Sequence, residues 1–264
     1  GRQLGLEIES IGGKRQPPRT PRQDADTIIA CLELHIEQAD RLETSQTDIG
    51  FVTDIPGISR YAIKVMGRAG HSGTTRMPDR QDALVAASEV ITTAQDTGIA
   101  IAEQDNKHFV ATIGRIDVYP NGAATVPGEV NMVLDLRASH EHSRDEFLKQ
   151  LQTRCMLISK NRSCKIEMEL ISNASVAVMD NELRQRLSHA ANSLNLSHID
   201  LSSGAGHDMV HLSRIAPAAM VFIPCKDGLS HCPEELATPE AIAKGSAVLA
   251  RTILALASDE PYNE

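Results

Sequence analysis

The stretch VNMVLDLRA, residues 130–138, places an apolar side chain at every even-numbered position. Val130, Met132, Leu134 and Leu136 would therefore share one face of a half-buried β-strand. A second run with the same character precedes it at residues 109–118. Both runs belong to a stretch from residue 60 to about residue 172 that the sequence predicts to be one compact unit.

Working outwards, the same kinds of pattern continue on both sides. Residues 79–97 carry apolar side chains at helical spacing, and residues 61–65 alternate as a strand does. After the central strands, Ser143 and Glu146 form the pattern of a capping box at the start of a second helix, and residues 165–170 alternate again. The predicted order is β-α-β-β-α-β, which is the ferredoxin-like arrangement.

The segments that flank this unit predict part of a different domain. Residues 32–37 would form a short strand with ionisable groups on one face, and residues 218–223 form an apolar strand. Helices are expected at residues 181–194 and 239–256. We therefore expect an α/β fold in which residues 55–172 are inserted between residues 1–54 and 173–264. The flanks are too short to build a full sheet with helices on both faces.

The overall composition excludes some classes of function. The chain has 264 residues and a net charge of −9, whereas nucleic-acid binding requires a concentrated positive surface. No apolar run is long enough to cross a bilayer, so no membrane partner is expected. The five cysteines lack the spacing of a structural zinc site, and reduced thiols in a cytoplasmic protein are the simplest explanation. The first residue is Gly1 instead of Met, which is compatible with a fragment.

Two histidines stand where a metal ligand could lie. His35 is flanked by acidic residues on a predicted strand, and His231 follows a glycine turn just after an apolar strand, where α/β proteins place ligands. Each also has an ordinary interpretation, because strand histidines are commonly exposed or paired with a neighbouring acid. A catalytic zinc generally needs three protein ligands, so these two residues do not establish a metal site by themselves.

Other residues could contact a substrate, although each again has a structural alternative. His71 lies in the loop GRAGHSGTT, residues 67–75, and could be no more than an exposed loop histidine. Arg137 could grip a carboxylate through two hydrogen bonds, or it could pair with Asp135 inside its own domain. His207, after a Gly-Ala-Gly turn, could equally belong to the start of a helix.

The order and spacing of the motifs resemble one family. The matching motifs are ELHIEQ (33–38), GHSGTT (70–75), RQD (80–82), PN (120–121), VPG (126–128), DLR (135–137), SGAGHD (203–208) and GLSH (228–231). Together they are similar to the M20-type amidohydrolases, which include allantoate amidohydrolase, N-carbamoyl-L-amino-acid hydrolase, ureidoglycolate hydrolase and β-ureidopropionase. The resemblance extends from about residue 21 to residue 256, nearly the whole chain.

This resemblance implies a role for each matching residue. It implies that His35 ligates one metal of a binuclear centre and that His231 ligates the other. Gln38 and His207 would contact the substrate, and Arg137 would hold its carboxylate. The resemblance further implies that His71, the expected catalytic residue, reaches across a dimer into the partner's site and stabilises an oxyanion.

The resemblance also implies a reaction and a domain organisation. The reaction is hydrolysis of a ureido or amide C–N bond with release of ammonia, assisted by two divalent metal ions, zinc or manganese. The substrate would be a small ureido or carbamoyl acid. Residues 1–54 and 173–264 would form part of the catalytic domain, and residues 55–172 would form a lid that also holds a homodimer together.

Two departures from the family pattern limit these expectations. The family's N-terminal section carries a His-x-Asp motif, a bridging Asp and a Glu-Glu pair, and no counterpart precedes Gly1 in this sequence. His198-Ile199-Asp200 and Glu234-Glu235 have two of these forms but stand at the wrong places in the motif order. We therefore expect an N-terminally truncated chain that cannot by itself hold two metals or turn over. In addition, Ala124 replaces an Asn that contacts substrate in the family, a loss that commonly costs about 1–3 kcal/mol in a buried pocket. Asn121 or Thr125 could compensate, or the substrate could differ.

Two other functions remain open at this level. The chain could be a non-catalytic dimerisation module left by truncation, although the retained histidines and Arg137 argue against long decay. It could also be an M20 peptidase or aminoacylase, but those relatives usually carry an acidic ligand at the position of His35.

Overall fold

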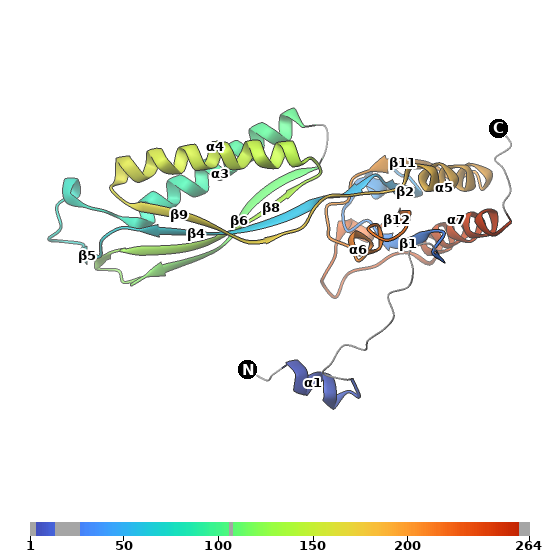
Figure 1. The fold of residues 1–264 in the computed structure, drawn as a ribbon, viewed down its shortest axis with the longest axis horizontal. Coiled ribbons are helices and arrows are strands. Elements are labelled where there is room, and N and C mark those ends of the chain that lie inside the picture. Colours follow the sequence, from blue (N-terminus) through green and yellow to red (C-terminus); the bar gives the residue numbers. More distant parts are fainter. Residues whose placement is uncertain (1–3, 14–26, 106–107, 259–264) are drawn as a thin grey trace.

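The computed structural model describes residues 4–13, 27–105 and 108–258, and its two larger β-sheets lie apart from each other (Figure 1). Each sheet has four strands, with the orders β6-β8-β4-β9 and β1-β12-β2-β11. Two short two-stranded ladders, β10-β3 and β5-β7, complete the pairing. We refer to the parts built on the two larger sheets as the antiparallel unit and the mixed-sheet unit.

The antiparallel unit has the predicted β-α-β-β-α-β order. Its elements are β4 (Gly57–Met66), α3 (Ala83–Gln104), β6 (Phe109–Tyr119), β8 (Glu129–Ala138), α4 (Glu141–Arg162) and β9 (Lys165–Asn173). The strand order and the antiparallel pairing of β4 with both β8 and β9 confirm the ferredoxin-like topology. Helices α3 and α4 cover one face of this sheet (Figure 1).

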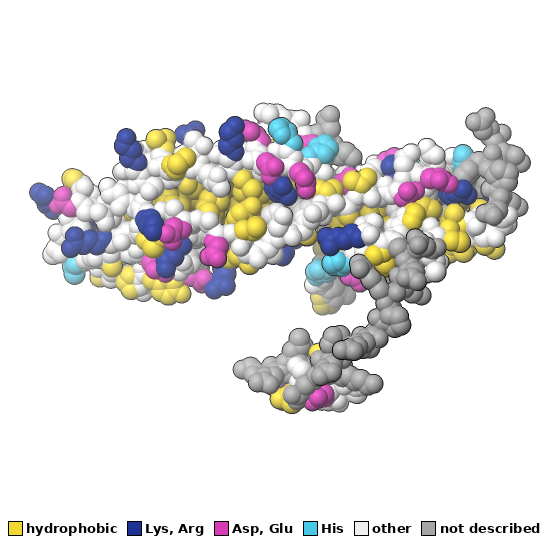
Figure 2. Space-filling view, in the orientation of Figure 1, with side chains coloured by type: hydrophobic (Ala, Val, Ile, Leu, Met, Phe, Trp, Pro, Cys, Tyr) yellow, Lys and Arg dark blue, Asp and Glu magenta, His cyan; other side chains and the backbone are white. Residues whose placement is uncertain are grey.

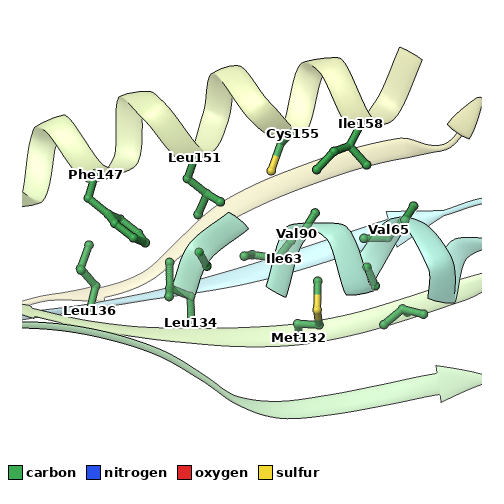
Figure 3. Packing of buried hydrophobic residues seen from close by; sticks show 14 of the residues in the cluster. Ile63, Val65, Val90, Met132, Leu134, Leu136, Phe147, Leu151, Cys155 and Ile158 are labelled. Atoms are coloured by element: carbon green, nitrogen blue, oxygen red, sulfur yellow. The ribbon is translucent and has the colours of Figure 1, made fainter. Parts of the chain in front are cut away.

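The core of the antiparallel unit lies between its sheet and its two helices, as Figure 3 shows. The buried pattern of β8 alternates along all ten residues, so one face of the strand points into this core. Phe147 and Leu151 of α4 are fully buried against that face, and Val90 is fully buried on α3. The apolar side chains at even-numbered positions of residues 130–138 are therefore the ones that this strand buries on its single covered face.

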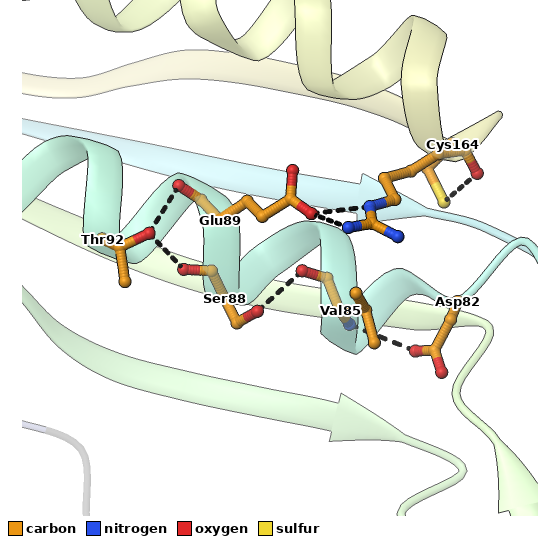
Figure 4. Close-up of polar contacts among 7 residues, drawn as sticks. Asp82, Val85, Ser88, Glu89, Thr92 and Cys164 are labelled. Carbon is orange, nitrogen blue, oxygen red and sulfur yellow. Dashed lines mark hydrogen bonds and ion pairs between the residues drawn. The ribbon is translucent and has the colours of Figure 1, made fainter.

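The starts of the two helices differ from the prediction. Helix α3 begins at Ala83 and not near residue 79, because the Asp82 side chain accepts hydrogen bonds from the backbone N–H groups of Leu84 and Val85. Figure 4 shows the contact with Val85. The expected capping box at Ser143 is wrong, since α4 begins at Glu141 and the Ser143 hydroxyl donates to the Asp105 carboxylate instead.

The helices are also joined to each other by an ion pair. Arg162, near the end of α4, places its Nε 2.6 Å from Oε1 of Glu89 on α3 (Figure 4). Both side chains are partly exposed to solvent. The pair therefore adds little stability, and the apolar core holds the helices on the sheet.

The mixed-sheet unit contains β1 (Cys31–Ile36), β12 (Ala218–Ile223), β2 (Ile49–Val52) and β11 (His198–Leu201). Strands β1 and β12 are parallel, β12 and β2 are antiparallel, and β2 and β11 are parallel. The strand at β12 has the predicted bounds and is buried along its whole length. Strands β2 and β11 are four residues each, too short for a clear alternation, and were not predicted.

Two long helices cover one face of the mixed sheet. They are α5 (Asn181–Ser193) and α7 (Pro239–Ala257), and they bury apolar residues against β2 and β12. The other face is covered by α2 (Arg41–Thr44) and α6 (Met209–Leu212), which are one turn each. As expected from the short flanks, long helices lie on only one side of this sheet.

The remaining elements are short and lie outside the two larger sheets. The ladder of β3 (Asp54–Ile55) with β10 (Ala177–Val178) lies where the chain passes between the two units. β5 (Gly70–His71), the 3-10 turn η2 (Met77–Asp79) and β7 (Thr125–Val126) form the far tip of the antiparallel unit (Figure 1). A 3-10 turn η3 (Lys226–Gly228) precedes α7, and α1 (Leu4–Ser10) lies apart from both sheets (Figure 1). No helix in the described ranges is long and apolar enough to cross a membrane.

Candidate functional site

The candidate site is built on β1 and its neighbour β12. Glu33 and His35 are two residues apart on β1, so their side chains lie on the same face of the sheet. His35 is the register partner of Phe222 on β12, and the centres of these two rings are 6.3 Å apart. The alternation seen in the sequence thus places a carboxylate and an imidazole side by side above the sheet.

A third group reaches this pair from the glycine-rich turn after β11. The ring centre of His207 lies 4.7 Å from that of His35 and 5.5 Å from that of Phe222. One ligand atom from each of Glu33, His35 and His207 lies within 4.8 Å of the other two, and no second such group occurs among the described residues. Two imidazole nitrogens and one carboxylate oxygen are a suitable donor set for one divalent transition-metal ion.

The hydrogen bonds of the two histidines determine which ring nitrogens remain available. Nδ1 of His35 is 2.8 Å from the carbonyl oxygen of Ile36, to which it donates, so Nε2 keeps its lone pair. Nε2 of His207 is 2.9 Å from the hydroxyl of the buried Ser203, which also lies 3.0 Å from the carbonyl oxygen of Ala205. When Ser203 donates to that carbonyl, His207 is protonated on Nε2, and its Nδ1 is the free acceptor.

Burial shifts the pKa values of this cluster towards the neutral forms. The pKa of His207 is lowered to about 4, chiefly by burial and then by the neighbouring His35, against a raising effect of Asp208. The pKa of the Glu33 carboxyl is raised by burial, while His35 opposes the rise. His207 is consequently neutral near pH 7, which suits a metal ligand. Its place beside Glu33 and His35 thus adds a possible metal-binding role to the substrate contact that the family resemblance implies.

The loop that carries His231 is attached to the loop after β1. Nε2 of Gln38 donates to the Ser230 hydroxyl at 2.9 Å, and Ser230 in turn donates to Glu235 at 2.7 Å. Glu235 also accepts the backbone N–H of His231 at 2.9 Å. The structure thus brings Gln38 and the His231 loop together, as one would expect of loops that leave the same ends of the parallel strands β1 and β12.

Glu37, the second acidic residue of the ELHIEQ motif, makes a structural contact. It is buried, and its Oε2 accepts the backbone N–H of Leu42 at 2.8 Å. Burial raises the pKa of this carboxyl, and the hydrogen bonds from the backbone of Leu42 and Arg41 oppose the rise. Glu37 therefore fixes the start of α2.

Arg137 lies at the junction of the two units. Its Nε is 2.9 Å from Asp135, which also pairs with Arg60 at 2.9 Å, so the intradomain Asp–Arg pair that the sequence allowed is present. Nη1 of the same guanidinium donates to the carbonyl oxygen of Gly204 at 3.2 Å. Arg137 is thereby positioned beside the turn that carries His207.

Two predicted site residues lie at the tip of the antiparallel unit, far from Glu33, His35 and His207. His71 is exposed on β5, where its Nδ1 accepts the backbone N–H of Gly73 at 3.0 Å. Asn121 directly follows β6 and has a positive φ of 55°. The nearby Ala124 carbonyl accepts the backbone N–H of Ser72 at 2.9 Å, which joins this loop to the His71 loop. All of these residues belong to the tip that Figure 1 shows at the opposite end of the molecule from β1. Within one chain, His71 and Asn121 are therefore not brought to Glu33, His35 and His207, which we call the histidine cluster.

Two members of the site were not selected from the sequence. Glu33 is one, although the period of two that places it beside His35 is visible in residues 32–37. Ser203 is the other, and nothing in the sequence indicates that its hydroxyl would orient His207, because the contact depends on how the turn closes.

Comparison with known proteins supplies a second line of evidence. Residues 8–255 match the model of peptidase family M20/M25/M40. The chain is 36% identical to an N-carbamoyl-L-amino-acid amidohydrolase of Paenarthrobacter aurescens over 89% of this chain and 56% of that protein. It is 35% identical to a ureidoglycolate hydrolase of Arabidopsis thaliana over 88% of this chain and 48% of that protein.

Solved structures agree with these sequence matches. A hydantoinase/carbamoylase family amidase from Burkholderia multivorans superposes with a TM-score of 0.84 at 34% identity, covering 99% of this chain and 62% of that one. The chain spans roughly half to three fifths of the length of the curated relatives it matches. The family model covers nearly the whole of this chain, and the chain therefore belongs to peptidase family M20/M25/M40.

Proposed function

We propose that this chain forms part of a metal-dependent amidohydrolase that cleaves a C–N bond in a small linear ureido or carbamoyl acid. The single observation that carries the proposal is the convergence of Glu33, His35 and His207, whose ligand atoms lie within 4.8 Å of one another. The names of the relatives support the substrate class, since they act on N-carbamoyl amino acids, ureidoglycolate and allantoate.

The donor set fits one divalent ion, zinc or manganese. His35 has its Nε2 available, His207 is neutral near pH 7, and Glu33 adds a carboxylate oxygen. A metal bound there would supply a Lewis acid that polarises the carbonyl group under attack. His231 is the candidate ligand for a second ion, but no second group of three donors occurs in the described residues.

The other residues of the chain would bind and orient the substrate. Arg137 presents a partly exposed guanidinium next to the Gly204 turn, where it can hold a carboxylate. Gln38 fixes the His231 loop through Ser230. We propose that His71, on the exposed tip of the antiparallel unit, contributes to the site of a second protomer, because it lies far from the histidine cluster of its own chain.

The proposal can be tested by metal binding and by activity on the chain itself. We expect about one zinc ion per chain, bound more weakly in His35→Ala and His207→Ala, and no ureide hydrolysis. Arg251→Ala, a change at an exposed position on α7, is the matched control and should bind zinc normally. Binding of two zinc ions together with robust turnover of allantoate or N-carbamoyl amino acids would contradict the proposal that this chain forms only part of the metal site.

A non-catalytic dimerisation module is the second candidate function. It is favoured by the completeness of the antiparallel unit, which has its own buried core and the tip that carries His71. Zinc binding separates the two candidates, since a module retained only for dimerisation has no reason to keep three converging donors.

A further inference from the structure

The backbone of the His231 loop, residues 226–236, leaves the regions that most residues adopt. His231 has a φ of 59° and Asp227 a φ of 54°, and Gln38, in the facing loop after β1, has a φ of 60°. Residues with a side chain rarely take this left-handed conformation, because their Cβ comes too close to the following carbonyl oxygen. It persists only where surrounding contacts hold it, so each of these residues requires contacts that fix its backbone.

Glu235 supplies the contacts that hold His231. Its Oε2 accepts the backbone N–H of His231 at 2.9 Å and the hydroxyl of Ser230 at 2.7 Å. The Ser230 hydroxyl donates its proton to Glu235 and accepts a hydrogen bond from Nε2 of Gln38 at 2.9 Å. A continuous chain of three hydrogen bonds therefore joins Gln38 and His231, two left-handed residues of different loops, through Ser230 and Glu235.

The two ends of the loop are attached by other groups. Oε2 of Glu43, on α2, accepts the backbone N–H of Asp227 at 2.7 Å. The backbone N–H of Lys226 donates to the carbonyl oxygen of Leu236 at 2.9 Å, which joins the ends of the loop to each other. Because these contacts do not involve Glu235, loss of its carboxylate would release the middle of the loop and leave both ends in place.

The middle of the loop lies at the surface of the protein. The side chains of His231, Glu234 and Glu235 are all exposed. Figure 2 shows histidine and acidic side chains at the surface of the mixed-sheet unit, which carries this loop. Changes at exposed positions generally have little effect on the free energy of unfolding. A surface carboxylate that fixes one backbone conformation therefore acts on local geometry more than on the stability of the fold.

We propose that Ser230 and Glu235 are positioning residues, which hold the backbone of His231 and the side chain of Gln38 in one fixed arrangement at the carboxyl ends of β12 and β1. The direction of a side chain depends on the φ of its own residue, so a change of φ at His231 would turn its imidazole away. The same change would free the amide of Gln38. The proposal rests on the proposed function for the use of Gln38 and His231 in the site, whereas the arrangement itself needs neither metal nor substrate.

The experiment compares variants of the full chain by NMR in the presence of a chelator. Glu235→Ala removes the acceptor of two hydrogen bonds, whereas Glu235→Gln keeps a carbonyl oxygen that can accept both. Ser230→Ala breaks the chain of hydrogen bonds but leaves the bond from the His231 N–H in place. Glu234→Ala is the matched control, because Glu234 is the neighbouring exposed glutamate and its side chain makes no hydrogen bond or ion pair with the residues that the structure describes.

Two signals report the arrangement directly. A positive φ brings the amide proton of a residue close to its own α proton, so His231 should give a strong nuclear Overhauser effect between them. We expect Glu235→Ala to lose this signal and to exchange the His231 amide hydrogen about tenfold faster than the wild-type chain. The side-chain amide resonances of Gln38 should move in both Glu235→Ala and Ser230→Ala. Glu235→Gln and Ser230→Ala should keep the His231 signal, and Glu234→Ala should match the wild-type chain in every respect.

Urea unfolding separates a positioning role from a purely structural one. The unfolding midpoint of Glu235→Ala should stay close to that of the wild-type chain, because the side chain is exposed. A clearly lowered midpoint would show that Glu235 supports the fold and would overturn the proposal. If Glu235→Ala does not fold, Ser230→Ala and Glu235→Gln still test the link to Gln38.

Three NMR results would also overturn the proposal. The first is an unchanged His231 signal in Glu235→Ala, and the second is an equal loss of that signal in Glu234→Ala. The third is a set of Gln38 amide resonances that moves in neither Ser230→Ala nor Glu235→Ala. All of these measurements are made without metal or substrate, whereas the proposed function is tested by zinc binding, so the failure of one is distinguishable from the failure of the other.

Discussion

The lowered pKa of His207 has a consequence for stability that can be measured without any substrate. The perturbation is His207→Gln in the metal-free chain, which keeps a nitrogen near the position of Nε2 and within reach of the Ser203 hydroxyl. The imidazole has an ordinary pKa of 6.5 that falls to about 4 in the folded protein, first because of burial and then because of His35. Glutamine does not titrate, so the variant lacks this contribution.

The direction in which the free energy of unfolding changes with pH depends on whether the folded or the unfolded chain binds the proton first. Above pH 6.5 both the folded and the unfolded chain hold a neutral His207, and the group adds no pH dependence. As the pH falls from 6.5 towards about 4, the unfolded chain binds a proton that the folded chain does not, so the free energy of unfolding decreases. Below about pH 4 both states are protonated, and the decrease stops.

The magnitude is bounded by the two pKa values. The difference between 6.5 and about 4 corresponds to roughly 3 kcal/mol if the ring were fully shielded. The ring is only part-buried, and solvent screening reduces the expected loss to about 1–2 kcal/mol. Glu33 has a raised pKa and acts in the opposite direction over the acid range, but it is present in both proteins.

The assay is urea denaturation of both proteins in a chelator, followed by circular dichroism at about pH 7 and about pH 4.5. The wild-type chain should lose about 1–2 kcal/mol more than His207→Gln between these two values. If both proteins lose the same amount, or the variant loses more, His207 is not buried in a neutral form and the explanation of the site is refuted.

Three further predictions concern the stability of the scaffold, each measured by urea or thermal unfolding. Phe147→Ala removes a fully buried ring from the core of the antiparallel unit and should cost about 3–5 kcal/mol. Asp180→Ala removes the cap that accepts the Leu183 N–H at 2.8 Å and should cost about 1 kcal/mol, whereas Asp208→Ala, at a helix start without such a bond, should cost less than about 0.5 kcal/mol. Gly67→Ala would place a Cβ 2.1 Å from a backbone carbonyl oxygen and should cost about 1–3 kcal/mol, while Gly114→Ala meets nothing within 4 Å and should be tolerated.

Much of the antiparallel unit could be predicted because each of its elements is buried on one side only. Residues 130–138 carry an apolar side chain at every even-numbered position, and the strand they form is buried on every second residue. The bounds of the helices were less predictable, because capping depends on which side chain reaches a free N–H. Ser143 had a favourable sequence pattern, but Asp105 lies near enough in space to bind its hydroxyl instead.

The candidate site was predictable in part. The contact between Gln38 and the His231 loop could be expected, because the loops follow the parallel strands β1 and β12, whose carboxyl ends lie at the same edge of the sheet. The approach of His207 to His35 could not be inferred, since 172 positions separate them and the turn after β11 runs back across the sheet to bring them together. Resemblance to a family suggested both residues but not their contact with Glu33.

The sequence by itself determined the antiparallel topology, the family and the identities of the groups that can bind metal or carboxylate. These features can be predicted from local sequence patterns, because alternation, helical spacing and motifs are properties of residues that lie near one another in the chain. Only the tertiary structure decided that Glu33, His35 and His207 converge, that His71 lies far from them in its own chain, and that β1 pairs with β12 alone among the described strands. These depend on contacts between residues distant in the chain, which are fixed by packing and not by local periodicity.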